Sequence, residues 1–156
     1  MQAQQGRSRP LAVLDPFIGQ WEMSASVGGV TLTGGRATFD WLEDGWFMVQ
    51  RADAEPTDDT PPEFVANSPF PTVCVIGLDD SSGEFSLLYA DARGVRRVYR
   101  MSFDGRVWKQ WRDAPGFFQR LEATFSDDGA TIAGRWEKSP DGSDWELDFE
   151  FAYGRS

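Results

Sequence analysis

Apolar and polar residues alternate along most of this chain. Between residues 19 and 27 the apolar positions are Trp21, Met23, Ala25 and Val27, with polar residues between them. The segment 145–153 repeats this alternation, with the apolar positions Trp145, Leu147, Phe149, Phe151 and Tyr153. A period of two with one polar face is typical of antiparallel β-strands that are buried on one side.

Clusters of Asp and Gly separate these runs at regular intervals. Examples are Asp79–Gly83, Asp104–Gly105, Asp127–Gly129 and Asp141–Gly142. Such residues supply the side-chain hydrogen bonds and positive φ angles of tight hairpins, and the spacing predicts about ten strands between Gly19 and Tyr153. Short connections make successive strands neighbours, and closing the sheet on itself removes its exposed edges. The sequence therefore predicts an all-β fold, an antiparallel up-and-down β-barrel.

Three segments depart from this pattern. Residues 1–10 are polar and predict a disordered tail, which leaves residues 11–156 as a single domain. Residues 11–17 could form one short helical turn before the first strand. Residues 53–71 are long and acidic and hold five prolines, namely Pro56, Pro61, Pro62, Pro69 and Pro71. Long loops of this kind are binding lids or mobile insertions, and both interpretations are kept.

Charge restricts the partners of this protein. The net charge is −10, which disfavours nucleic acid and anionic membrane surfaces. The N-terminus has no apolar signal segment, and no run of apolar residues is long enough for a membrane helix. These features predict a cytoplasmic protein that binds neither nucleic acid nor membranes. Thirteen Arg beside Lys109 and Lys138 suggest a bacterial source with GC-rich DNA.

The chain has no histidine and one cysteine. It therefore lacks the commonest metal ligand, the usual haem ligand and the usual general base. Cys74 lies in the apolar run 73–76 and is interpreted as a small hydrophobic residue. Neither a metal nor a cofactor is expected.

Several motifs carry a family resemblance. The run Phe17-Ile18-Gly19-Gln20-Trp21 contains the Gly-x-Trp that resembles the signature of lipocalins and the wider calycin group, in which the Trp closes one end of the barrel. The segments 35–39, 93–95, 126–137, 141–146 and 153–155 are similar to a bacterial lipocalin-like family of unknown function. The resemblance extends from about Leu11 to Arg155 and implies a calycin-like barrel.

The resemblance also carries expectations about single residues. In lipocalins an Arg near the last strand packs over the closing Trp, and here Arg155 or Arg135 could take that role. Nitrobindins share this type of barrel and hold haem through a His. Because this chain has none, nitrobindin-type haem binding is not expected.

The segment 95–103 contains the clearest candidate site. Its alternation places Arg97 and Tyr99 on the inward face. The pattern Arg-x-Tyr on an inward strand resembles the pair that holds a carboxylate in fatty-acid-binding proteins. A guanidinium binds a carboxylate through two hydrogen bonds, and a phenol adds a donor. The alternative is structural, with Arg97 paired to an internal Asp or Glu or stacked on a Trp.

Other residues could complete a ligand site. Gln119 faces inward if the segment 117–125 alternates regularly. Trp108, Gln110 and Arg112 would stand beside it if their strand turns that face inward; otherwise Val107 and Trp111 fill the core. The remaining candidates are Tyr89 and Tyr153, each offering a phenol unless its hydroxyl is bonded to backbone, and Trp46 and Met48, at the predicted mouth.

Three functions follow from these observations. The first is a binding protein for a small hydrophobic molecule with a carboxylate or carbonyl group. The second is a cofactor-independent cyclase or isomerase that folds a hydrophobic intermediate in the same lumen. The third is a filled barrel with a structural or interaction role. A homodimer is compatible with each of them.

Overall fold

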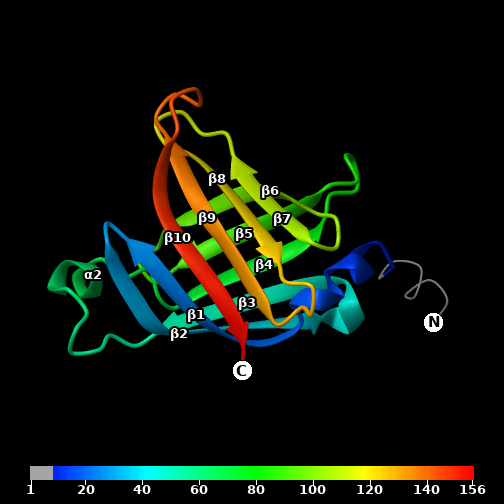
Figure 1. Ribbon diagram of the computed structural model, residues 1–156. Helices are drawn as coiled ribbons and strands as arrows, with labels where there is room; N and C mark the ends of the chain where they lie inside the picture. Colours follow the sequence, from blue (N-terminus) through cyan, green and yellow to red (C-terminus); the bar gives the residue numbers. More distant parts are fainter. Residues whose placement is uncertain (1–8) are drawn as a thin grey trace.

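The structure, a computed structural model, describes residues 9–156 and contains a closed barrel of ten antiparallel strands (Figure 1). Each strand pairs with the next one along the chain, and β1 pairs with β10 to close the barrel. The predicted all-β, up-and-down architecture is therefore confirmed. The strands are β1 Gly19–Val27, β2 Val30–Leu42, β3 Phe47–Ala54, β4 Thr72–Leu78, β5 Phe85–Asp91, β6 Arg96–Phe103, β7 Val107–Arg112, β8 Phe118–Phe125, β9 Thr131–Ser139 and β10 Glu146–Arg155.

One end of the barrel is closed by the 3-10 helix η1, Arg9–Phe17 (Figure 1). The Phe17 side chain is fully buried, and its ring lies about 5 Å from four other aromatic rings, those of Phe39, Phe103, Trp108 and Phe125. The expected helical turn at residues 11–17 is thus present, and it forms the plug. Residues 1–8, which hold most of the predicted tail, lie outside the described residues.

Arg155 fastens the plug to the barrel. Its guanidinium lies 4.2 Å above the Trp21 ring and donates hydrogen bonds to the carbonyl oxygens of Ile18 at 2.9 Å and Pro16 at 2.5 Å. The Trp21 indole in turn donates to the carbonyl oxygen of Phe17 at 2.8 Å. Of the two arginines considered from the sequence, Arg155 therefore packs over the Trp.

The segment between β3 and β4 lies at the end of the barrel opposite η1. It contains the short helix α2, Pro62–Ala66, visible at the left of Figure 1. The backbone N–H of Ala92 donates to the carbonyl oxygen of Pro69 at 3.0 Å, which joins this segment to the turn between β5 and β6. Within residues 9–156, no helix has the length and apolar character needed to cross a bilayer.

The predicted alternation is wrong at the start of β10. A bulge shifts the register with β9 between Leu147 and Phe149, so Leu147 is exposed and Phe149 packs inward against the core. Trp145, also expected on the apolar face, lies against the outward Arg120, whose guanidinium is 4.0 Å from its ring. One extra residue in a strand reverses the face of every residue beyond it, which a strict period of two does not anticipate.

Candidate ligand site at the open end

Arg97, Tyr99 and Gln119 meet inside the barrel near the end opposite η1. The Tyr99 hydroxyl donates to Gln119 Oε1 at 2.5 Å, and Arg97 Nη1 donates to the same oxygen at 3.4 Å. Tyr99 and Gln119 are both buried, and Arg97 is half-buried. Because β7 separates β6 from β8 in the sheet, these bonds cross the interior. The inward facing expected from the alternation is observed for all three.

Arg97 has no carboxylate partner among residues 9–156. Its guanidinium lies 4.9 Å from the Phe117 ring and 6.0 Å from the Tyr89 ring. Of the two structural alternatives considered from the sequence, the internal ion pair is not formed within the described chain. Aromatic stacking is formed, on Phe117 rather than on a Trp. A guanidinium has five N–H donors, and the amide of Gln119 accepts one of them.

The strand β7 turns its Trp108 face inward, which decides the orientation that the sequence left open. Trp108 and Gln110 are buried, whereas Lys109 between them is exposed. Trp111 lies on the outer side, where the Arg100 guanidinium is 5.2 Å from its ring. Polar and aromatic side chains of β7 therefore line the interior beside Gln119, which pairs with Arg112 in the ladder between β7 and β8.

Three consecutive inward positions of β7 carry buried polar atoms without a hydrogen-bond partner in the described part of the chain. They are Trp108 Nε1, Gln110 Oε1 and Arg112 Nε. Buried polar atoms are normally paired, because leaving one unpaired costs about 1–3 kcal/mol. A row of three along one wall makes this side of the interior suited to a polar partner.

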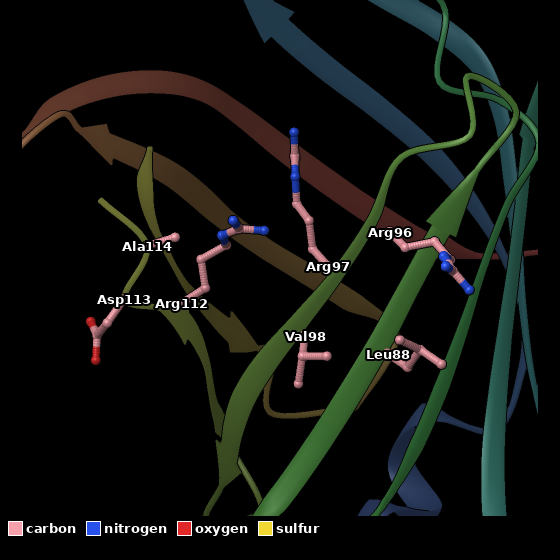
Figure 2. Close-up of a pocket in the computed structure, with 7 residues that line it drawn as sticks. All are labelled: Leu88, Arg96, Arg97, Val98, Arg112, Asp113 and Ala114. Carbon is pink, nitrogen blue, oxygen red and sulfur yellow. The ribbon is translucent and has the colours of Figure 1, made fainter. Parts of the chain in front are cut away.

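A cleft of about 520 Å³ lies in the barrel wall between the ends of β6 and β7 (Figure 2). The ladder between these strands ends at the pair Arg100 and Trp111, although β6 continues to pair with β5 as far as Arg96. The cleft is lined by outward residues such as Val98 and by the inward-facing Arg97 and Arg112. The cleft therefore borders both arginines beyond the point where the ladder between β6 and β7 ends.

The side chains packed against the core are not all fully buried. Met23, Trp136, Phe149 and Tyr153 are among those that keep part of their surface accessible. A side chain inside a closed barrel remains accessible only where neighbouring side chains leave space. The Trp136 ring lies 5.6 Å from the Tyr99 ring, which places part of this apolar surface next to the polar cluster. Aromatic walls with a few convergent polar groups are typical of ligand sites.

Burial keeps the Tyr99 hydroxyl protonated. Burial raises the pKa of its hydroxyl above the usual value, and the nearby Arg97 and Arg112 only partly oppose this shift. The phenol is therefore a hydrogen-bond donor at neutral pH.

Tyr89 is bonded within the protein. Its hydroxyl donates to Asp91 Oδ2 at 2.7 Å, and the same carboxylate oxygen forms an ion pair with Arg93 at 2.7 Å. Burial, with help from Asp91, raises the Tyr89 pKa, while the hydrogen bond from Arg93 holds the Asp91 pKa well below its usual range. The expected structural role of Tyr89 is thus present, with a carboxylate rather than backbone as the acceptor.

The remaining predicted residues lie deeper in the barrel or at its closed end. The Tyr153 hydroxyl accepts a hydrogen bond from Gln50 Nε2 at 3.2 Å, and burial raises its pKa to about 12. Met48 is fully buried in the core. Trp46 follows the 3-10 turn η2, Glu43–Gly45, at the same end as η1. The structure does not bring Trp46 or Met48 together with Arg97.

Three residues near the site, namely Asp91, Lys138 and Phe117, were not among the predicted set. Asp91 falls on the inward face that alternation assigns to its strand, so the sequence carried a signal for it. Lys138 pairs with Gln119 in the ladder between β8 and β9 and lies 3.8 Å from Asp148. Neither that pairing nor the contact of Phe117 with Arg97 can be derived without the register.

Comparison with known proteins supports the fold. No family model matches this chain, and no curated protein matches it. The crystal structure of Rv2717c from M. tuberculosis is similar, with a TM-score of 0.60 and 14% identity over 94% of this chain and 97% of that one. At this identity the likeness concerns the fold alone, and it fits a calycin-like barrel. Membership of the bacterial lipocalin-like family stays a prediction. The barrel is compatible with ligand binding.

Proposed function

We propose that this protein binds a small apolar molecule whose carboxylate or carbonyl group lies at the open end of the barrel. The observation that carries the proposal is the pair of inward-facing guanidinium groups, Arg97 and Arg112, which have no carboxylate partner within residues 9–156. Charged groups withdrawn from water are costly unless they are paired. An anionic ligand would supply the missing partner.

Each residue has a distinct part in the proposed complex. Arg97 would hold the head group through its remaining N–H donors, and Tyr99 would donate its hydroxyl proton. Gln119, which accepts from both residues, would fix their orientation. The accessible surfaces of Trp136, Phe149 and Tyr153 would contact the apolar part of the ligand.

The test compares a charged probe with its uncharged counterpart. Binding of cis-parinaric acid and of its methyl ester is measured by fluorescence titration with the wild-type protein and with Arg97→Ala. We expect the variant to bind the acid at least about tenfold more weakly, the loss typical of a charge-assisted hydrogen bond, and to bind the ester almost unchanged.

Comparing the affinity for the acid with the affinity for the ester separates loss of the anchoring charge from a general loss of folding, because misfolding would weaken binding of both probes. Arg51→Ala is the matched control, because Arg51 is exposed on the outer face of β3 and its replacement removes the same charge. Equal affinity of wild type and Arg97→Ala for the acid would contradict the anchoring role. Failure of the wild-type protein to bind either probe would favour a filled barrel.

A further inference from the structure

The lining of the cleft between β6 and β7 includes three arginines, Arg96, Arg97 and Arg112, and little negative charge. Its lining includes one acidic residue, Asp113, which is exposed, and Figure 2 shows the Asp113 carboxylate directed away from the Arg112 guanidinium. The same figure shows the Arg112 side chain extending towards Arg97, whereas Arg96 extends to the other side of β6.

Other nearby carboxylates are already paired with other cations. Asp91 accepts from Arg93 and Tyr89, and Asp148 lies 3.8 Å from Lys138. Within the described residues the site therefore holds two guanidinium groups and no carboxylate bonded to either. Two like charges in a partly desolvated site repel each other, and each retains unused N–H donors.

We propose that the head group of the ligand carries two negative charges and binds between Arg97 and Arg112. This inference rests on the proposed function and narrows its ligand class. A single carboxylate can form the paired hydrogen bonds of one guanidinium, whereas a phosphate monoester or two carboxylates on one carbon can engage two. Arg112 Nε, buried and without a partner in residues 9–156, is one of the donors that such a group would meet.

The position of the cleft also fixes how the ligand is oriented. The head group lies in the wall of the barrel, where the cleft opens to the outside past Leu88 and Val98. The apolar tail extends inward, past Tyr99 towards the accessible rings of Trp136 and Phe149. Both outer residues are exposed and apolar, with exposed fractions of 47% and 64%, so a tail can pass them on entry.

The experiment compares ligands of the same shape and different charge. Decyl phosphate and decyl sulfate have similar tetrahedral head groups, but at about pH 8 the phosphate carries nearly two negative charges and the sulfate one. Calorimetric titration below the concentrations at which these compounds form micelles gives both affinities. We expect the wild-type protein to bind the phosphate at least about tenfold more tightly. Comparing the affinities for decylmalonate and decanoate then tests whether two carboxylates on one carbon can replace the phosphate.

Variants of Arg112 test whether this residue causes the preference for decyl phosphate over decyl sulfate. Arg112→Gln should lose the preference for decyl phosphate over decyl sulfate, because removing the second guanidinium weakens binding of the doubly charged head group more than binding of the singly charged one. Arg112→Lys keeps the charge but loses the planar pair of guanidinium donors, and should retain an intermediate preference for decyl phosphate. Arg51→Gln, which removes one charge from the outer face of β3, should keep the full preference. Thermal unfolding of each variant confirms that it is folded.

Two outcomes would overturn the inference, and only one of them would also reject the proposed function. Equal affinities of the wild-type protein for decyl phosphate and decyl sulfate, or a preference that survives in Arg112→Gln, would reject the doubly charged head group and leave anionic ligand binding intact. Binding of none of the four compounds would reject the proposed function as well.

Discussion

The Tyr99 hydroxyl lies 2.5 Å from Gln119 Oε1, and this hydrogen bond joins β6 to β8 across the interior, past the strand between them. Both side chains are buried, so neither polar group is satisfied by bulk water. The oxygen of Gln119 also accepts from Arg97. The pair therefore sets the position of the guanidinium at the point where the barrel wall opens.

Replacing Tyr99 with Phe should lower the free energy of unfolding by about 1 kcal/mol, because a buried hydrogen bond is lost and its acceptor stays buried. Urea unfolding followed by fluorescence measures the change. A double-mutant cycle with Gln119→Leu isolates the pair, and we expect the double variant to be less destabilised than the sum of the two single variants. Strictly additive effects would mean that the two side chains do not interact in solution.

Replacing Arg155 with Ala should lower the free energy of unfolding by about 2 kcal/mol. The change removes hydrogen bonds to three carbonyl oxygens, those of Pro16, Ile18 and Gly129, and the stacking over Trp21. Arg135→Ala is the control, because Arg135 is an exposed arginine of β9 and surface changes are usually within about 0.5 kcal/mol. Similar losses in both variants would show that Arg155 does not fasten the plug.

Local patterns were enough to predict the architecture. Alternation and turn residues act within a few positions, and they correctly indicated a ten-strand barrel with Arg97, Tyr99 and Gln119 facing inward. For β7 the alternation was equally clear. Its direction stayed open because Trp108 and Trp111 are both large and apolar, so neither face was distinctly the solvent face.

Features that depend on register could not be predicted. The bulge before Phe149 turns Leu147 outward, and no local residue pattern marks its position. The early end of the ladder between β6 and β7 creates the cleft, and it is a property of two strands together. The pairing of Asp91 with Tyr89 and Arg93, which leaves Arg97 without a carboxylate, likewise follows from three-dimensional placement.

Gly134 in β9 should not tolerate a larger residue. A Cβ atom there would lie 2.4 Å from both the Ala123 Cβ and the carbonyl oxygen of Glu122, so backbone of the neighbouring strand would have to move. We expect Gly134→Ala to lower the free energy of unfolding by about 2 kcal/mol. Gly154→Ala is the control, since its Cβ would meet nothing within 4 Å. Comparable unfolding midpoints for the two variants would contradict the close approach of β8 and β9.

Stability should fall with rising pH because of Cys74. Burial raises the pKa of the folded thiol to about 12, whereas the pKa of an unfolded cysteine is about 8.5. The folded state therefore keeps a proton that the unfolded state loses. The resulting stabilisation is complete below about pH 8 and declines by up to about 1.4 kcal/mol per pH unit as the pH rises towards 12.

The decline can be assigned to Cys74 by comparison with Cys74→Ala. Tyr89, Tyr99 and Tyr153, whose pKa values burial also raises, add most of their own decline above about pH 10, where an unfolded tyrosine ionises. Urea unfolding between about pH 8 and pH 9.5 thus isolates the thiol. The variant is less stable at every pH, because it loses a buried sulfur, but its free energy of unfolding should depend less on pH in this interval. Parallel pH curves for the two proteins would mean that the thiol is accessible to water and ionises in the folded barrel.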